Sequence, residues 1–399
     1  MPDTGANAGE PDVGDVEVTV AHVLAAQARL RRHLPITPLH HAERFGVWLK
    51  LENLQRTGSY KVRGALNALL AGRERGDERP VICASAGNHA QGLAWAAHRL
   101  GMQAITVMPH GAPQNKIAGV AHWGATVRQH GNSYDEAYAF ARELAAQNDY
   151  RFLSAFDDPD VIAGQGTVGI EIAAHAPDVV IVPIGGGGLA SGVAMVLKSQ
   201  GVRVVGAQVE GVDAMARAIH GDTRLVDPVA TLADGVKVKV PGWITRRLCA
   251  SLLDDVVIVR EAELRETLVR LALEENVIAE GAGALALAAG RRVAGKRKCA
   301  VVSGGNIDAT VLARLLSEVR PRAPRKPRRR TEALQPVEPA PRRRADEPTP
   351  AAAGHHPVQS PAVPTARRSA AQAAIQAPDR NPPIPRQASR ALAEEEYIL

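Results

Sequence analysis

The sequence predicts an α/β protein with two doubly wound, mostly parallel sheets. Short apolar runs of strand length alternate along the chain with longer segments of helical periodicity, a pattern typical of parallel sheets. The chain has 399 residues, of which 45% are hydrophobic, so it is long enough for two domains with a sizeable core. Only 3% of the residues are aromatic. We therefore expect a core made mainly of Ala, Val, Leu and Ile.

The first expected elements are a helix, a strand and a second helix. Residues 18–34 have helical character, and Thr37-Pro38-Leu39 ends this helix. Residues 48–52 alternate as in a strand, and residues 63–70 have the periodicity of a helix. Three strand and helix pairs follow and are expected to form a small domain: 81–84 with 92–100, 104–108 with 113–122, and 126–129 with 133–148.

The second half of the chain continues the alternation. The expected elements are a crossover at 155–159, a helix at 163–174, strands at 179–184, 202–209 and 299–302, helices from 189, at 261–275 and from 284, and a turn at 279–283. We expect a large domain from residues 15–75 and 156–320, a small domain from residues 76–155, and a flexible arm at residues 1–14. Ligands bind at the carboxyl ends of parallel strands. The site is therefore expected in the cleft between the domains.

Lys61 is the first candidate for chemistry, because it stands between the strand at 48–52 and the helix that follows. The positive end of a helix dipole disfavours an ammonium, and the flanking Tyr60 and Val62 help to desolvate it. Both effects lower the pKa of Lys61, and a neutral lysine is a nucleophile able to form a Schiff base. The alternative is a surface lysine that opens a helix.

Two glycine-rich turns are candidates for binding an anion. Ser85-Ala86-Gly87-Asn88-His89-Ala90-Gln91-Gly92 follows the apolar run at 81–84, and Gly185-Gly186-Gly187-Gly188 follows the apolar run at 179–184. In a strand, turn and helix arrangement the backbone N–H groups hold an anion, and four glycines let the backbone close around a phosphate. A plain strand-to-helix connection is the alternative for either turn.

Four motifs, taken together and in order, carry a family resemblance. They are Ser59-Tyr60-Lys61-Val62-Arg63-Gly64-Ala65, the segment from Ser85 to Gly92, the four glycines from Gly185, and Ser303-Gly304-Gly305-Asn306. The chain resembles, from about Val18 to Arg320, the threonine dehydratases (threonine ammonia-lyases). These enzymes belong to the tryptophan-synthase-β-like, fold type II group of pyridoxal 5′-phosphate (PLP) enzymes. The resemblance implies PLP as the cofactor, bound in the cleft between the domains.

The resemblance also implies a role for each matching residue. Lys61 would carry PLP and then, as a free amine, remove the α-proton of the substrate. Tyr60 would pack on the cofactor ring, where the family more often has Phe, and Asn88 would bond the ring 3′-oxygen. Two groups complete the site: a carboxylate-binding loop at Ser85, Ala86, Gly87, Asn88 and His89, and a phosphate-binding turn at Gly185, Gly186, Gly187, Gly188 and Leu189.

Ser303 matches the residue that would face the pyridine nitrogen. A serine does not hold that nitrogen protonated as an aspartate would, which favours expulsion of a β-hydroxyl group over transamination. The implied activity is a lyase that converts L-threonine to 2-oxobutyrate and ammonia, in isoleucine biosynthesis or threonine catabolism, and L-serine to pyruvate.

Three alternatives remain open. A serine racemase needs a second acid or base, and racemases have a serine where this chain has Ala86, so elimination is favoured. A cysteine synthase has a lysine segment and an asparagine loop of different character. The third alternative is a PLP-binding regulatory protein without catalysis, against which the intact Lys61, Asn88, glycine turn and Ser303 argue.

Two departures from the family pattern concern a metal site and a loop. Glu210 and the carbonyl of Ala214 match ligands of a divalent-cation site in some relatives, but Ala216 replaces the third, so we expect no metal. Gly281 stands where relatives usually have proline after the equivalent of Glu280, which predicts a more flexible loop.

The segment after residue 320 differs in composition. Residues 321–399 hold 15 of the 27 prolines, and their 14 basic and 8 acidic residues account for the whole net charge of +6. This segment is expected to be a disordered tail without the ACT-type regulatory domain of many relatives, and with no nucleic-acid or membrane partner.

The cysteines and the first residues bear on the compartment. Cys83, Cys249 and Cys299 are odd in number and lack a paired spacing, which favours a reducing cytoplasm and no zinc site. Residues 1–14 show no secretory pattern. By resemblance, we expect a homodimer or homotetramer that acts on a small amino acid.

Overall fold

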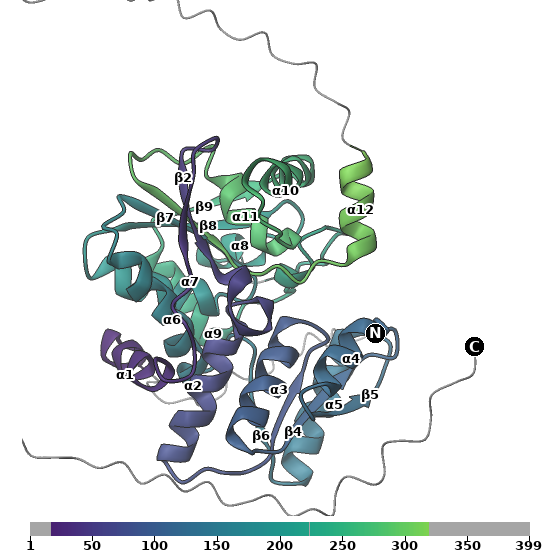
Figure 1. Ribbon diagram of the computed structural model, residues 1–399. Helices are drawn as coiled ribbons and strands as arrows, with labels where there is room; N and C mark the ends of the chain where they lie inside the picture. The colour runs from purple at the N-terminus through teal and green to yellow at the C-terminus, as the bar shows by residue number, and fades with distance from the viewer. Residues whose placement is uncertain (1–16, 223, 319–399) are drawn as a thin grey trace, which may run out of the picture. The chain divides into compact units, whose positions relative to one another are not determined.

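The computed structural model describes residues 17–222 and 224–318 (Figure 1). The arm expected at residues 1–14 and the tail expected at residues 321–399 lie outside the described residues. All described residues belong to one compact unit.

The larger sheet has six strands in the order β1-β2-β10-β7-β8-β9. Every neighbouring pair is parallel except β1 and β2, which form an antiparallel hairpin at one edge. The prediction of a mostly parallel sheet is confirmed. The strands are β1 (Leu39–Ala42), β2 (Val47–Leu51), β7 (Val179–Pro183), β8 (Arg203–Val209), β9 (Asp255–Val259) and β10 (Lys298–Val302).

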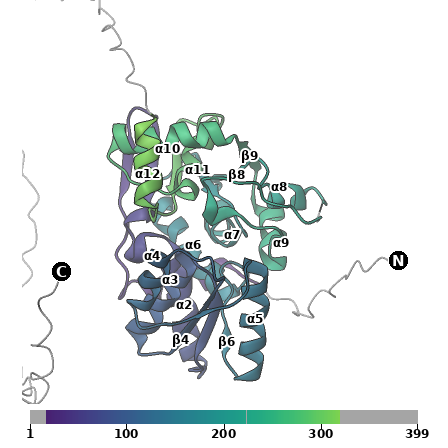
Figure 2. The ribbon, with the colours of Figure 1, turned by 90° about the vertical axis from the view of Figure 1, so that its right-hand side faces the viewer.

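The smaller sheet, of which Figure 2 labels β4 and β6, has four parallel strands in the order β5-β4-β3-β6. They are β3 (Val81–Ala84), β4 (Ala104–Met108), β5 (Thr126–Gln129) and β6 (Arg151–Phe152). All four lie inside the range expected for a small domain. The domain ranges themselves stay a prediction.

Helices cover both faces of each sheet, as a doubly wound fold requires. They are α1 (Val20–Leu30), α2 (Lys61–Glu74), α3 (Asn88–Leu100), α4 (Gln114–Ala121), α5 (Tyr134–Gln147), α6 (Pro159–Ala173), α7 (Gly188–Lys198), α8 (Ala214–Ile219), α9 (Trp243–Leu252), α10 (Glu261–Glu275), α11 (Gly281–Ala289) and α12 (Ala309–Ser317). Single 3-10 turns occur at Glu52–Leu54, Arg56–Gly58 and Asp234–Val236.

The side chains of β7 show how the layers are built. Val179 and Ile181 pack on one face in a core cluster with residues of α10 and α11, and Val180 and Val182 pack on the other with residues of α6 and α7. Both faces are apolar because helices bury both, so the strand is a continuous hydrophobic run. Within the described residues, the fully buried hydrophobic side chains are Ala, Val, Leu, Ile, Met and Cys, which confirms the expected aliphatic core.

Several boundaries differ from expectation. Helix α3 begins at Asn88 and not at residue 92, and residues 281–283 are the first turn of α11 and not a loop. Gly281 is buried, and a Cβ there would lie 2.1 Å from the carbonyl oxygen of Leu232. The expected loop at Gly281 is therefore wrong, because this residue belongs to α11, which packs directly against a neighbouring backbone; the expected flexibility stays a prediction.

Candidate active site

Lys61 is the first residue of α2 and follows β2 after two short 3-10 turns. Its Nζ atom donates a hydrogen bond to the carbonyl oxygen of Ala155 at 2.8 Å and lies 5.2 Å from the ring centroid of Tyr60. The lysine is thus at the start of the helix, as predicted, and its amine faces the crossover at Ala155.

Burial lowers the pKa of Lys61 from 10.5 to about 8, although the Glu280 carboxyl opposes the shift. A carbonyl oxygen stabilises an ammonium less than a carboxylate does, and here the desolvation of the charge dominates. A substantial part of this amine is therefore neutral near pH 8, and a neutral amine is what attack on a carbonyl carbon requires. Burial and Glu280 also raise the pKa of Tyr60.

A buried network of charged side chains anchors α2 behind the lysine. Arg63 donates to both carboxylate oxygens of Glu52, at 2.7 and 2.8 Å, and to both of Glu171, at 2.7 and 3.0 Å. Lys50 contacts Glu171 at 2.5 Å and donates to the carbonyl oxygen of Thr37 at 2.6 Å. Two acids and two bases thus tie α2 to the end of β2 and to α6, which limits the movement of Lys61.

Asn88 connects the smaller sheet to the larger one. It is the first residue of α3, and its Nδ2 donates to Glu280 Oε1 at 2.6 Å. Its Oδ1 accepts a hydrogen bond from Asn306 Nδ2 at 2.8 Å. Burial raises the pKa of Glu280, and the hydrogen bond from Asn88 opposes this shift. The structure brings together Asn88, Glu280 and Asn306 from three separate segments.

The loop before Asn88 lies between β3 and α3. Ser85 accepts a hydrogen bond from the backbone N–H of Gly87 through its Oγ at 3.2 Å, and Ala86 is half-buried. His89 is buried, with Nε2 3.1 Å from the carbonyl oxygen of Leu153. A carbonyl only accepts, so Nε2 carries the proton, and burial together with Lys61 lowers the pKa of His89 to about 3. The imidazole is therefore neutral and its donor is already used.

The four glycines join β7 to α7. Gly187 has φ +99°, a conformation that favours glycine, and the first N–H groups of α7 have no acceptor within the helix. A Cβ on Gly186 would lie 2.2 Å from the ring of Phe156. The turn is thus packed under the same crossover whose Ala155 carbonyl accepts from Lys61. Leu189 is buried within α7.

Ser303 directly follows β10 and is 3% exposed. Its Oγ donates to the carbonyl oxygen of Ala282 at 3.3 Å, and its own carbonyl oxygen accepts from the N–H of Tyr60 at 3.1 Å. The serine is therefore held next to the residue that precedes Lys61.

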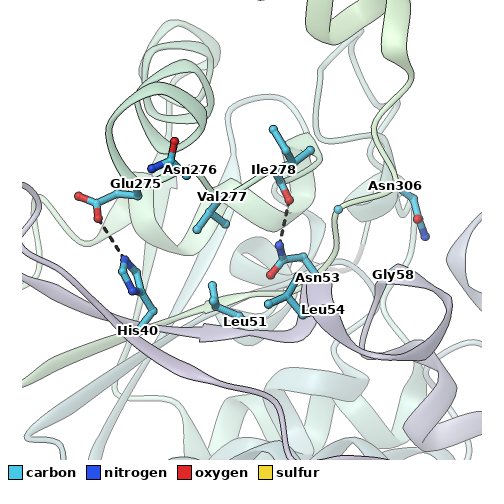
Figure 3. Close-up of a pocket in the computed structure, with 11 residues that line it drawn as sticks. His40, Leu51, Asn53, Leu54, Gly58, Glu275, Asn276, Val277, Ile278 and Asn306 are labelled. Atoms are coloured by element: carbon cyan, nitrogen blue, oxygen red, sulfur yellow. Dashed lines mark hydrogen bonds and ion pairs between the residues drawn. The ribbon is translucent and has the colours of Figure 1, made fainter.

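A cavity of about 440 Å³ lies beside this site (Figure 3). His40 and Glu275 form an ion pair at one end, with 3.1 Å between Nε2 and Oε2, and Asn53 donates to the carbonyl oxygen of Ile278 at 2.9 Å. Asn306 lines the other end, while Lys61 is not part of the lining. The cavity therefore borders the candidate site without containing its lysine.

Sequence reasoning did not find every residue of the site. It missed the Ala155 carbonyl and Phe156, which were seen only as part of a crossover, and it gave no role to Asn306. Thr245, which donates to the carbonyl oxygen of Gly186 at 2.6 Å, also carried no sequence signal. A backbone acceptor and a threonine inside a helix have no motif, so only the fold identifies them.

Two further features bear on a metal site and on a membrane span. Glu210 directly follows β8 and is exposed, and Ala216 donates its N–H to Gln208 Oε1 at 2.8 Å. Within residues 17–222 and 224–318, no group of three or more His, Cys, Asp or Glu side chains is placed to hold a metal ion. In the same part of the chain, no helix has both the length and the apolar character needed to cross a bilayer.

These residues fit PLP as a cofactor. A half-buried amine with a lowered pKa suits a link to an aldehyde, and the glycine turn before α7 suits a phosphate because the first N–H groups of that helix have no acceptor within it. The half-buried Asn88 and the buried Ser303 carry polar groups of the kind that suit a ring oxygen and a ring nitrogen. The fold and this set of residues define a PLP enzyme of fold type II.

Comparison with known proteins gives the family. Residues 30–304 match the model of the pyridoxal-phosphate dependent enzyme family, and the chain belongs to this family. It is 41% identical over 315 residues to the L-threonine ammonia-lyase of Thermotoga maritima. The aligned region covers 75% of this chain and 79% of that protein.

Solved structures give the same fold. The processed threonine deaminase isoform 2 of Solanum lycopersicum superimposes with a TM-score of 0.70 at 34% identity, over 75% of this chain and 92% of that chain. Maize serine racemase superimposes with a TM-score of 0.71 at 27% identity, over 75% of this chain and 97% of that chain. The structural match therefore includes both lyases and racemases.

Proposed function

We propose that this chain is a PLP-dependent threonine ammonia-lyase that converts L-threonine to 2-oxobutyrate and ammonia, and also L-serine to pyruvate. The observation that carries the proposal is the half-buried amine of Lys61, which stands at the start of α2, donates to the carbonyl oxygen of Ala155 and has a pKa lowered by burial. The relatives whose names include L-threonine ammonia-lyase support the choice of substrate.

Each part of the cofactor has a candidate contact. Lys61 would carry it, Tyr60 would pack on its ring and Asn88 would bond its ring oxygen. Its phosphate would bind the backbone N–H groups of the turn formed by Gly185, Gly186, Gly187, Gly188 and Leu189. When bound, PLP supplies the electron sink for the carbanion formed at the substrate α-carbon.

The protein has to hold the substrate and move protons. The loop from Ser85 to His89 would hold the substrate carboxylate, chiefly through its backbone N–H groups, because the imidazole of His89 donates to Leu153. Nζ of Lys61, neutral near pH 8, would remove the α-proton. The Ser303 hydroxyl would face the ring nitrogen and leave it uncharged, which favours loss of the β-hydroxyl group.

The side chain of Ala86 favours a lyase over a racemase. Racemisation needs a second group to deliver a proton to the opposite face of the α-carbon, and the methyl group of Ala86 has no proton to give. We therefore propose elimination as the main reaction of L-serine.

The absorbance spectrum of purified protein with added PLP, followed by product analysis, tests this proposal. Wild-type protein is expected to show a visible band of lysine-bound cofactor and to form 2-oxobutyrate from L-threonine. Lys61→Ala should lose both, whereas Lys198→Ala, which removes an exposed lysine paired with Asp254, should keep both. D-serine as the main product from L-serine would refute the lyase assignment, and no visible band in the wild type would refute PLP binding.

We further propose a homodimer or homotetramer in the cytoplasm. The exposed side chains of Leu54 and Ile278 line the same cavity and are suited to a partner surface, and Cys83, Cys249 and Cys299 are buried free thiols, as in a reducing compartment. Light scattering after size-exclusion chromatography measures the assembly, and a monomer would refute it.

A further inference from the structure

Asn306 joins three loops around the candidate site. Its Nδ2 donates to the carbonyl oxygen of Thr57 at 2.8 Å, in the loop before Lys61, and to Oδ1 of Asn88 at 2.8 Å. Asn88 in turn donates from Nδ2 to Glu280 Oε1 at 2.6 Å. One chain of three hydrogen bonds thus runs from the lysine loop, through two amides, to the start of α11.

The donor and the acceptor of each of these three hydrogen bonds follow from the group at one end, the carbonyl of Thr57. The carbonyl of Thr57 only accepts, so Asn306 must present its NH₂ group to it. That NH₂ group also faces Asn88, so Asn88 must present its oxygen to Asn306 and its NH₂ group to Glu280. A flip of either amide would place two acceptors or two donors in contact. One N–H of Asn88 is used by Glu280, and the other is left for a ligand.

Close packing around the two amides leaves their side chains little room to move. A Cβ on Gly58 would lie 2.3 Å from Asn306 Oδ1, and a Cβ on Gly304 would lie 2.5 Å from Glu280 Oε1 and 3.2 Å from Asn88 Nδ2. Thr57 has φ +63°, which is rare for a β-branched residue and persists only where the surroundings hold it. The hydrogen bond from Asn306 is one contact that holds this turn.

We propose that Asn306 is a positioning residue, which fixes the side-chain amide of Asn88 so that its second N–H points to the cofactor. The inference rests on the proposed function, because it takes Asn88 as a contact of PLP. Asn306 itself needs no contact with cofactor or substrate. On this proposal its effect on PLP binding passes through Asn88 and not through its other partner, the carbonyl of Thr57.

A double-mutant cycle on cofactor binding tests this. The dissociation constant of PLP is measured by titrating the apoprotein and following the visible band, for Asn306→Ala, Asn306→Asp, Asn88→Ala and the double variant Asn88→Ala/Asn306→Ala. Asn53→Ala is the matched control, because Asn53 also donates from its amide to a distant backbone carbonyl, that of Ile278, without touching Asn88.

Asn306→Ala and Asn306→Asp are expected to weaken PLP binding about threefold to tenfold, the range that one net hydrogen bond gives. In the Asn88→Ala background the second substitution should change the constant by less than about twofold, since coupled residues are not additive. Asn53→Ala should bind PLP as the wild type does.

Other outcomes overturn the inference. An equal loss in both backgrounds would show that Asn306 acts through Thr57 and the lysine loop. Binding like that of the wild type, or loss of the folded state in both Asn306 variants, would show no positioning role. A wild type that binds PLP but does not deaminate threonine refutes the proposed activity, while the binding cycle still decides the role of Asn306.

Discussion

Replacing Arg63 by methionine should destabilise the fold strongly, because Arg63 is the base that both buried acids share. Arg63 and Glu52 are 2% and 0% exposed, and Glu171 is 9% exposed. Methionine keeps most of the volume of the arginine stem but leaves Glu52 and Glu171 with only Lys50 as a counter-charge. Removing one partner of a buried pair costs about 3–5 kcal/mol, because a charge is left buried without compensation.

The assay is urea unfolding at pH 7, with Arg73→Met as the control on the same helix. Arg73 pairs with Glu78 at 3.2 Å, but the two side chains are 40% and 66% exposed, so its loss should cost less than about 1 kcal/mol. For Arg63→Met we also expect a melting temperature lower by roughly 10 °C.

The pH dependence separates a charge effect from a loss of packing. Burial raises the pKa of Glu171, but hydrogen bonds and charges from Arg63 and Lys50 outweigh it, so the pKa lies below its usual value. A depressed carboxyl pKa stabilises the fold above the unfolded pKa, and this contribution is lost as pH falls through the folded pKa. The free-energy difference between wild type and Arg63→Met should therefore be largest near pH 7 and shrink as the pH falls below 4.5, the usual pKa of a glutamate. A difference under 1 kcal/mol at pH 7, or one that does not change with pH, would refute the reasoning.

Four further predictions concern the site and its frame. The rate at which apoprotein captures PLP should rise about tenfold per pH unit below pH 8 and level off above it, because a pKa lowered to about 8 sets the neutral fraction of Lys61; a stopped-flow profile that still rises to pH 10 would contradict this. Glu280→Gln should move that midpoint to lower pH, because the Glu280 carboxyl opposes the lowering of the lysine pKa; an upward shift would count against it. Ser303→Asp should lower kcat for L-threonine at least tenfold, because a carboxylate would be buried against the carbonyl oxygen of Ala282; kcat near that of the wild type would remove Ser303 from the site. Gly281→Ala should cost about 1–3 kcal/mol in urea unfolding, since its Cβ would meet the Leu232 carbonyl; an unchanged midpoint would mean that α11 shifts freely.

Much of the fold was predictable because the parallel strands are buried on both faces. Runs such as residues 179–183 and 299–302 are apolar without alternation, and glycine turns mark the points where helices begin. The sequence did not predict β1, β9 or α9. The strand β1 contains two histidines, so its apolar signal is weak, whereas β9 holds the short apolar run at residues 256–259, which sequence reasoning overlooked. Pairing with β2 and β8 establishes these strands, and such long-range pairing leaves no local pattern.

The candidate site was predictable where it consists of motifs and not where it consists of contacts. Lys61 and Asn88 each lie at the start of a helix after a strand, which the strand, turn and helix pattern indicates. The role of Glu280 was left open, and its contact with Asn88 spans 192 residues of sequence. The orientation of His89 toward Leu153 is likewise a property of packing, because either ring nitrogen is a possible donor in the sequence alone.

The charges around Lys61 explain how a lysine stays partly neutral beside a charged network. Arg63 lies only two residues away, yet Arg63, Lys50, Glu52 and Glu171 form pairs whose charges cancel, so the network anchors α2 without a net field at the amine. The carboxyl of Glu280 favours the charged form of Lys61. Burial raises the pKa of Glu280 itself, which favours the neutral carboxylic acid and weakens this effect. The amine is left with a carbonyl oxygen as its hydrogen-bond acceptor, and desolvation then decides its pKa. Anchoring and activation of the lysine are thus carried by different groups, which is why Arg63→Met should change stability far more than the pH midpoint of cofactor capture.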